Sequence, residues 1–443
     1  MSDRKETPSE GCPLAVPSGR VARMTRMGLM ASGVAGDMAV NGLRQLGRGK
    51  RPAMRDLLLV PGNMRRIADE LAHMRGAAMK MGQLMSMDGG DVLPPELADI
   101  LARLRADAHF MPPKQLKKVL NTNWGDGWLR EVRRFDVRPI AAASIGQVHR
   151  AQLCDGRDLA IKVQYPGVAR SIDSDVSNVG MLLRVSGLIP SGFEMAPYLA
   201  EARRQLHEET DYAQEARYLL SYRDRIGESD AFVVPEFHAD WSTDAILSMG
   251  FVDGVPIETV TEADQHERNR VASLLIDLML RELFEFGLMQ TDPNFANYRY
   301  DPESRRIILL DFGATRHLSP ETAAQYRALL RSGLDQDRDG LEAAAEAIGF
   351  VDDAMTTDHR ARILDMIALV FKTITDGPEY DFTRTDLTRH LNAEGTALAE
   401  EGMVPPTPAM DALYLQRKFG GMFLLATRLK AKLCVRSLLE ARL

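Results

Sequence analysis

The segment from Gln290 to Gly313 most constrains the fold of this chain, because it places three oxygen-bearing side chains around a predicted hairpin. It reads QTDPNFANYRYDPESRRIILLDFG. We expect a loop, a short strand over Asn297 to Tyr300, a turn and a buried strand over Ile307 to Leu310. The oxygen-bearing side chains lie in the loop, five residues later and at the end of the second strand: Asp292, Asn297 and Asp311.

These three side chains are of the kinds that phosphoryl transfer requires. One carboxylate orients the attacking hydroxyl or water, while an amide oxygen and a second carboxylate hold Mg²⁺ against the phosphates. The D-x-x-x-x-N spacing followed by Asp-Phe-Gly is that of protein-kinase catalytic loops. We therefore predict a catalytic Asp292 and a metal site at Asn297 and Asp311. A surface turn with capping Asp and Asn is the alternative.

A second kinase-like feature is a lysine inside an apolar strand. Residues Leu159 to Val163 read L-A-I-K-V, which resembles the V-A-I-K strand whose lysine contacts the α- and β-phosphates. This strand pairs naturally with one over Gln147 to Leu153 through the turn Asp155-Gly156. Lys162 is thus a predicted catalytic and phosphate-binding residue, unless it is an edge-strand lysine that reaches water.

A small-residue segment stands where a kinase has its glycine-rich phosphate loop. Its backbone can still approach phosphates, but alanine lacks the freedom of glycine at positive φ, so the loop should be stiffer. Met249 ends a predicted strand from Ala245 at the position of the kinase hinge and is a further candidate for nucleotide contact. The loop residues predicted to bind nucleotide are Ala141, Ala142, Ala143, Ser144, Ile145 and Gly146.

A carboxylate-rich segment supplies the partner that kinases give to the strand lysine. We predict one helix over Glu208 to Tyr218, with Glu215 as the partner of Lys162, although most acids on a helix are merely solvated. No GxxxxGK[ST] motif occurs, which excludes a P-loop by its motif. The nine histidines form no HExxH pair, which argues against a zinc hydrolase.

Composition and charge limit the kinds of partner and the cellular compartment that we expect for this protein. The net charge of −7 over 443 residues argues against a nucleic-acid partner. Three dispersed cysteines fit a reducing, cytoplasmic setting, and we detect neither a signal peptide nor a membrane-spanning run. From Arg20 to Arg55 there are eight basic residues and one acid. This segment either lies peripherally on an anionic membrane or packs as a helix on the protein.

Several motifs together resemble the UbiB/AarF (ADCK-type) family of atypical kinases. They occur in order and cover roughly residues 60 to 350. The K-x-G-Q motif from Lys80 to Gln83 is the family's own and is absent from ordinary protein kinases. The other motifs are the Ala-rich loop, the E-x-D at Glu209 and Asp211, and the Asp292, Asn297 and Asp311 set.

The resemblance implies a fold, a site and a function. It implies an α+β, two-lobed protein-kinase-like fold with an added N-terminal helical (KxGQ) subdomain, and regulatory roles for Lys80, Gln83, Glu209 and Asp211. Lys80 and Glu209 would meet and the KxGQ helices would cover the peptide-binding region. We divide the chain into a tail and basic segment (1–60), the KxGQ subdomain (61–125), an N-lobe with a helical insertion (126–255) and a C-lobe (256–443).

The implied activity uses ATP and Mg²⁺. The favoured hypothesis is a membrane-stimulated ATPase that supports isoprenoid-quinone (ubiquinone) biosynthesis, with anionic lipids, quinone precursors or other quinone-biosynthesis proteins as partners. The alternatives are a phosphotransferase acting on a small molecule, lipid or protein, and a nucleotide-binding scaffold with negligible turnover. The C-terminal end is basic and amphipathic, and either closes the large lobe or lies on a membrane: Arg417, Lys418, Arg428, Lys430, Lys432 and Arg436.

Overall fold

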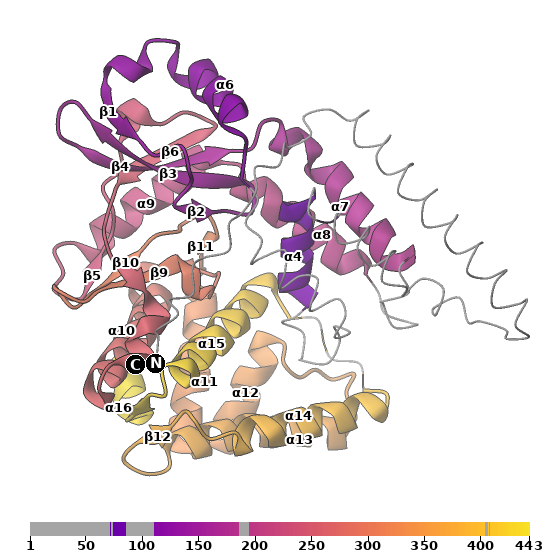
Figure 1. The fold of residues 1–443 in the computed structure, drawn as a ribbon. Coiled ribbons are helices and arrows are strands. Elements are labelled where there is room, and N and C mark those ends of the chain that lie inside the picture. Colours follow the sequence, from indigo (N-terminus) through magenta and orange to yellow (C-terminus); the bar gives the residue numbers. More distant parts are fainter. Residues whose placement is uncertain (1–70, 72–73, 86–109, 186–194, 404–405, 407) are drawn as a thin grey trace, which may run out of the picture. The chain divides into compact units, whose positions relative to one another are not determined.

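The computed structural model describes residues 71, 74–85, 110–185, 195–403, 406 and 408–443. The chain divides into two compact units (Figure 1). Unit 1 comprises Met1–Ala216 and Glu236–Phe251, and unit 2 comprises Arg217–Pro235 and Val252–Leu443. The basic segment from Arg20 to Arg55 lies outside the described residues. No helix among the described residues is long and apolar enough to cross a membrane.

Unit 1 contains an antiparallel sheet in which β1, β3, β4 and β6 lie side by side and β2 pairs with β3 (Figure 1). Its apolar side packs on Trp124, Trp128 and Trp241. The ring of Trp124 meets each of the other two rings edge to face. Gly156, at φ 98°, forms the predicted turn between β3 and β4. The strands are β1 (Val132–Phe135), β2 (Ala141–Ala142), β3 (Gly146–Leu153), β4 (Asp158–Gln164) and β6 (Ile246–Gly250).

The helices of unit 1 come before and between the strands of this sheet in the chain. Helix α4 packs against both α7 and α8. The helices of unit 1 are α4 (Arg75–Met85), α6 (Pro113–Trp124), α7 (Val168–Val185) and α8 (Ala196–Glu209), with short turns η1 (Trp128–Arg130) and η2 (Ala239–Trp241). Helix α9 (Tyr212–Ile226) begins in unit 1 and continues into unit 2.

The prediction of a single helix over Glu208 to Tyr218 is wrong. Helix α8 ends at Glu209 and α9 begins at Tyr212. Asp211 causes the break, because its Oδ1 accepts a hydrogen bond from the backbone N–H of Gln214 at 2.8 Å. A short acidic side chain that caps a helix start in this way competes with continuous helical hydrogen bonding. Glu209 and Glu215 therefore belong to different helices.

Unit 2 combines small sheets with many helices (Figure 1). Strands β5 (Phe232–Val233), β10 (Arg306–Leu309), β9 (Tyr298–Asp301) and β7 (Val255–Pro256) form one sheet, and β8 (Leu288–Gln290) pairs with β11 (Thr315–His317). A third pair joins β12 (Tyr380–Asp381) to β13 (Lys432–Leu433). The shorter turns are η3 (Ile257–Glu262) and η5 (Phe295–Asn297).

The helices of unit 2 come before, between and after these strands in the chain. Helix α10 begins at a capping Asp264, whose side chain accepts from the Glu267 N–H, and it ends in a π-helical turn that Gly287 terminates at φ 58°. Helices α11, α12 and α13 pack on one another. The helices are α10 (Gln265–Arg281), η4 (Glu282–Phe286), α11 (Pro320–Asp335), α12 (Arg338–Ile348), α13 (Thr357–Thr375), α14 (Asp386–Glu400), α15 (Met410–Arg428) and α16 (Val435–Glu440).

Candidate functional site

The hairpin of β9 and β10 brings two of the predicted oxygen ligands next to each other. Leu309 pairs with Tyr298, and the next N–H along, that of Leu310, donates to the backbone oxygen of Asn297 at 3.0 Å. Asp311 follows directly, so it stands beside Asn297 at the open end of the hairpin. Asn297 ends a short 3₁₀ turn and β9 starts one residue later than predicted, because Asn294 Oδ1 accepts from the Ala296 N–H.

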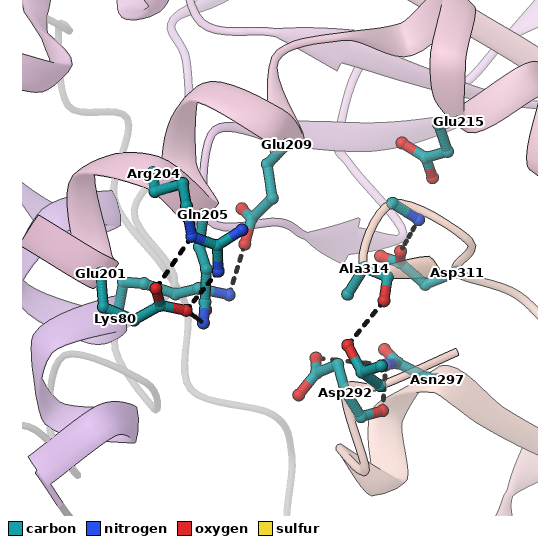
Figure 2. Close-up of polar contacts among 12 residues, drawn as sticks. Lys80, Glu201, Arg204, Gln205, Glu209, Glu215, Asp292, Asn297, Asp311 and Ala314 are labelled. Carbon is teal, nitrogen blue, oxygen red and sulfur yellow. Dashed lines mark hydrogen bonds and ion pairs between the residues drawn. The ribbon is translucent and has the colours of Figure 1, made fainter. Parts of the chain in front are cut away.

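Asp292 joins this pair through Asn297. The Asn297 amide nitrogen donates to the backbone oxygen of Asp292 at 3.2 Å and to its Oδ2 at 3.3 Å (Figure 2). The N–H and hydroxyl of Thr291 both donate to the Ala314 carbonyl, at 3.0 and 2.7 Å, which joins the loop to the chain just after Asp311. The structure thus gathers Asp292, Asn297 and Asp311 within unit 2.

The donor chemistry of this cluster fits a hard divalent cation. Asn297 uses its amide nitrogen toward Asp292, so its amide oxygen is the atom that can face a cation. Asp311 accepts from the Gly313 N–H through Oδ1 at 2.9 Å, which fixes the orientation of its carboxylate (Figure 2). An amide oxygen beside a carboxylate is a ligand set that Mg²⁺ prefers, whereas zinc sites use mainly nitrogen and sulfur ligands.

In unit 1, the strand lysine and the predicted glutamate form a buried ion pair. Lys162 Nζ on β4 donates to both oxygens of Glu215, at 2.8 and 2.9 Å. The Lys162 side chain is 11% exposed and that of Glu215 is 2% exposed. Glu215 stands in the first turn of α9, where the helix dipole favours a negative charge. The predicted pairing is therefore present, and the catalytic role of the pair stays a prediction.

The predicted contact between the KxGQ lysine and the E-x-D glutamate is also present. Lys80 Nζ on α4 lies 2.6 Å from Glu209 Oε1 at the end of α8, with side chains 4% and 20% exposed (Figure 2). Gln164, at the end of β4, donates to the Thr210 carbonyl at 2.7 Å and so ties the E-x-D segment to the sheet. Asp211 caps α9. The Gln83 side chain lies outside the described residues.

The predicted phosphate loop is a tight hairpin between β2 and β3. Ala141 and Ala142 are exposed, whereas Ile145 is buried. Gly146 permits this geometry, because a Cβ there would lie 2.3 Å from the Val163 carbonyl oxygen. Met249 lies on β6 opposite Ala160 and is 6% exposed. The nucleotide contacts of these residues remain predictions.

Helix α4 rests directly on this hairpin. A Cβ on Gly76 would lie 2.6 Å from the backbone oxygen of Ser144. No real Cβ approaches an oxygen that closely, so only glycine permits the contact without a shift of the backbone. The helix that carries Lys80 therefore touches the backbone of the predicted phosphate loop within unit 1.

Comparison with known proteins places these features in one family. The ABC1 atypical kinase-like domain family matches residues 103–345, more than half of the chain. The chain belongs to this family. The α+β kinase-like fold and the family predicted from the motifs are thereby confirmed, and the protein is of the ATP-dependent, kinase type.

Relatives of this ABC1-family chain match it over nearly all its length. It is 35% identical over 420 residues to "Atypical kinase COQ8, mitochondrial" of Saccharomyces cerevisiae, covering 94% of this chain and 83% of that protein. It is 34% identical to "Atypical kinase COQ8B, mitochondrial" of Rattus norvegicus, covering 96% and 80%. Rv3197 of Mycobacterium tuberculosis, solved with erythromycin, shares the fold at a TM-score of 0.58 and 22% identity, covering 83% and 92%.

Two neighbouring cations on α15, which lies beyond the residues that the ABC1 family matches, were not assigned to the site from the sequence. Arg417 Nη2 lies 3.0 Å from Asp292 Oδ1, with side chains 11% and 18% exposed. Lys418 is buried, and its Nζ donates to the Gln290 carbonyl at 2.7 Å. These two residues therefore lie in the interior of unit 2, which excludes them from a membrane-facing basic surface. Helix α15 packs on α10 in unit 2, as expected for a helix that closes the large lobe.

A buried polar network surrounds Lys418. Its ammonium lies 3.3 Å from Glu282 Oε2 and 3.2 Å from the Tyr298 hydroxyl, and Tyr222 donates to Glu282 Oε1 at 2.8 Å. Burial alone would lower the pKa of Lys418, but Glu282 and Tyr298 outweigh it and hold the pKa above its ordinary value. Burial raises the pKa of Glu282, and Lys418 and Tyr222 offset part of that rise. The lysine is therefore held as a cation next to Gln290, at the start of the predicted catalytic loop.

The sequence does contain a weak sign of this network. Arg417 and Lys418 interrupt an otherwise apolar stretch, LYLQRKFGGMFLLA, and are followed by Gly420 and Gly421. Basic residues in apolar surroundings beside small residues can mark a helix that approaches another backbone closely. The same pattern also fits an amphipathic surface helix, so the sequence alone leaves the two readings open.

Proposed function

We propose that this ABC1-family protein is an ATPase that membrane surfaces stimulate and that supports isoprenoid-quinone (ubiquinone) biosynthesis. The gathering of Asp292, Asn297 and Asp311 around the end of one hairpin carries this proposal. A scaffold without turnover has no need for a carboxylate, an amide and a second carboxylate in this arrangement. The confirmed family membership supports the same chemistry.

Each unit contributes residues with distinct roles. In unit 2, Asp292 would orient the attacking water, while the Asn297 amide oxygen and the Asp311 carboxylate would hold Mg²⁺. Bound there, Mg²⁺ would neutralise charge on the phosphate oxygens. In unit 1, Lys162 would contact the phosphates in the orientation that Glu215 gives it. Ala141 to Gly146 would approach the phosphates, and Met249 would contact the nucleotide.

Water is favoured over a peptide as the acceptor because features that serve peptide substrates are missing from the sequence. Gln290 and Thr291 replace the His-Arg that precedes the catalytic Asp of protein kinases, and no Ala-Pro-Glu follows Asp311. The contact of Gly76 with Ser144 also keeps the KxGQ helix on the predicted phosphate loop. We propose that the Lys80–Glu209 ion pair holds this helix in place and that Gln83 and Asp211 assist it as regulatory residues.

The membrane and quinone parts of the proposal depend on sequence features and on relatives. Eight basic residues against one acid between Arg20 and Arg55 suit an anionic lipid surface. The UbiB/AarF resemblance links proteins of this kind to quinone biosynthesis, and the yeast and rat relatives carry the name mitochondrial atypical kinase. Anionic lipids, quinone precursors and other quinone-biosynthesis proteins are the proposed partners, and the cytoplasm, with peripheral attachment to a membrane, is the proposed location.

The test follows labelled phosphate from γ-labelled ATP and Mg²⁺. Purified protein is incubated with phosphatidylcholine vesicles, with and without phosphatidylglycerol, and free phosphate is separated from labelled protein and lipid. The proposal predicts free phosphate that rises when the anionic lipid is present. Label on lipid, on protein or on an added small molecule would instead indicate a phosphotransferase. Nucleotide binding without release of phosphate under any lipid condition would indicate a scaffold.

A further inference from the structure

The catalytic loop carries no positive charge of its own. From Gln290 to Asn297 it reads QTDPNFAN, with one carboxylate and no lysine, arginine or histidine. Yet Asp292 is only 18% exposed, and an ionised carboxylate at that depth needs a counter-charge or several hydrogen bonds. The compensating cation must therefore come from elsewhere in the chain.

Arg417 of α15, which lies 125 residues later in the sequence, provides this cation. Its Nη2 donates to Asp292 Oδ1 at 3.0 Å. Oδ2, the other carboxylate oxygen, accepts the longer hydrogen bond from Asn297 at 3.3 Å. Among the described residues, Nε of Arg417 is buried and donates to no acceptor, so Asp292 is the carboxylate that this guanidinium serves. The two donors approach opposite oxygens and fix the carboxylate plane from both sides.

Helix α15 is itself fixed against the same loop at two further points. Lys418, the next residue, donates to the carbonyl oxygen of Gln290 at 2.7 Å. One turn later, a Cβ on Gly421 would lie 2.0 Å from Cβ of Pro293, so the helix backbone lies directly against the loop. A side chain reaching from a rigid, buried helix holds its partner more accurately than one on a mobile loop does.

We propose that Arg417 is a positioning residue for the reaction, which holds Asp292 Oδ1 so that Oδ2 faces the nucleophile. This inference rests on the proposed ATPase function and adds a residue to it. Arg417 itself touches neither nucleotide nor metal in this account. It sets the rotation of the Asp292 side chain, and misplacement of a catalytic group by about 1 Å can slow a reaction on the order of 100-fold.

The inference predicts a specific kinetic pattern for Arg417→Ala. We expect kcat for ATP hydrolysis to fall by roughly 10- to 100-fold while KM for ATP changes by less than about 3-fold, because the substrate-binding residues are untouched. Guanidinium ion at millimolar concentration should restore part of kcat, because it can occupy the vacated position and donate to Oδ1. Equal concentrations of ethylammonium or sodium chloride should not. The kcat of Arg417→Lys should be lower than that of Arg417→Ala with added guanidinium, since a single ammonium lacks the planar fork of donors.

Arg389→Ala provides the matched control, because Arg389 is an exposed arginine of unit 2 whose side chain donates to Thr385, the N-cap of helix α14. It should retain wild-type kcat and show no response to guanidinium. Wild-type kcat in Arg417→Ala would overturn the inference and leave the ATPase proposal intact. A lowered kcat that guanidinium does not restore would also overturn it, because loss of fold would then explain the result. An inactive wild-type protein would overturn the ATPase proposal itself and the inference with it.

Discussion

Lys418 Nζ lies 3.3 Å from Glu282 Oε2, and both side chains are only 2% exposed. The pair joins α15 to the π-helical turn after α10, and through the Gln290 carbonyl it reaches the start of the catalytic loop. Glu282 is the first residue of this π-helical turn. The pair thus anchors, within unit 2, the loop that carries Asp292.

Replacing one partner of this pair should cost far more than replacing both. Lys418→Met leaves the buried Glu282 carboxyl without its cation, and we expect a loss of about 3–5 kcal/mol in the free energy of unfolding. Lys418→Met combined with Glu282→Leu should recover much of that loss. Urea unfolding followed by fluorescence measures both. A loss in the double variant equal to the sum of the losses in Lys418→Met and Glu282→Leu alone would show that the charges are not coupled.

The Lys162–Glu215 pair predicts a loss of nucleotide affinity when its carboxylate is neutralised. Glu215→Gln removes the charge that orients Lys162, so we expect the Kd for Mg·ATP to rise at least roughly 10-fold, the equivalent of about 1.4 kcal/mol. Isothermal titration calorimetry checks this. Asp224→Asn, an exposed acid on the same helix, is the control and should bind as the wild type does. Unchanged affinity in Glu215→Gln would remove Lys162 from the nucleotide site.

The contact between Gly76 and the Ser144 carbonyl predicts a steric penalty. Gly76→Ala would place a Cβ 2.6 Å from that oxygen, so α4 or the hairpin must move. We expect unit 1 to lose about 1–3 kcal/mol of stability, as overpacking does. Thermal unfolding of Gly76→Ala beside Gly127→Ala measures the difference, because a Cβ on Gly127 meets no atom within 4 Å. A stable Gly76→Ala would mean that α4 does not rest on the hairpin.

We expect Glu267 to make a pH-dependent contribution to the stability of unit 2. Burial opposes its ionisation, but hydrogen bonds from Arg270, Arg305 and Tyr300 outweigh burial and lower the pKa of Glu267 to about 2, from an ordinary 4.5. Because the folded pKa is the lower one, the stabilisation is full above about 4.5 and is lost as the pH falls through about 2. Solvent screening limits it to about 1 kcal/mol.

The measurement compares Glu267→Gln with the wild type by urea unfolding at several pH values between 7 and 3. We expect a constant difference down to about pH 4.5 and a shrinking one below it. Glu303→Gln, an exposed glutamate, should show no such trend. A difference that grows on acidification would reverse the sign of the linkage and contradict the assignment of these hydrogen bonds.

The sequence predicted the parts of the site that follow from local pattern. The strand with Lys162, the turn at Gly156 and the hairpin before Asp311 are each encoded by a few adjacent residues, and the structure contains all of them. Glu215 was found as the partner of Lys162 because a carboxylate-rich helix and a strand lysine form a recurrent pair. Local periodicity and spacing suffice for such elements.

Contacts across long sequence separations were beyond the same reasoning where no recognised motif marks both partners. The ion pair of Arg417 with Asp292 joins residues 125 apart, and that of Lys418 with Glu282 joins α15 to the start of a π-helical turn, which the sequence pattern does not predict. The expected helix over Glu208 to Tyr218 runs through Asp211 and so misses the break between α8 and α9, where Asp211 caps α9. Packing decides whether a charged side chain points to water or inward, and packing is a property of the whole unit.

The central claim is that Asp311 and its neighbours form a metal-dependent site that cleaves ATP. The most direct test is the steady-state release of phosphate from ATP and Mg²⁺ by the wild type and by Asp311→Asn, with Asp335→Asn as an exposed control. The account predicts turnover by the wild type and the control, and a loss of at least roughly 100-fold in Asp311→Asn, since a metal ligand is removed. Wild-type turnover in a folded Asp311→Asn at saturating Mg²⁺ and ATP would contradict the account.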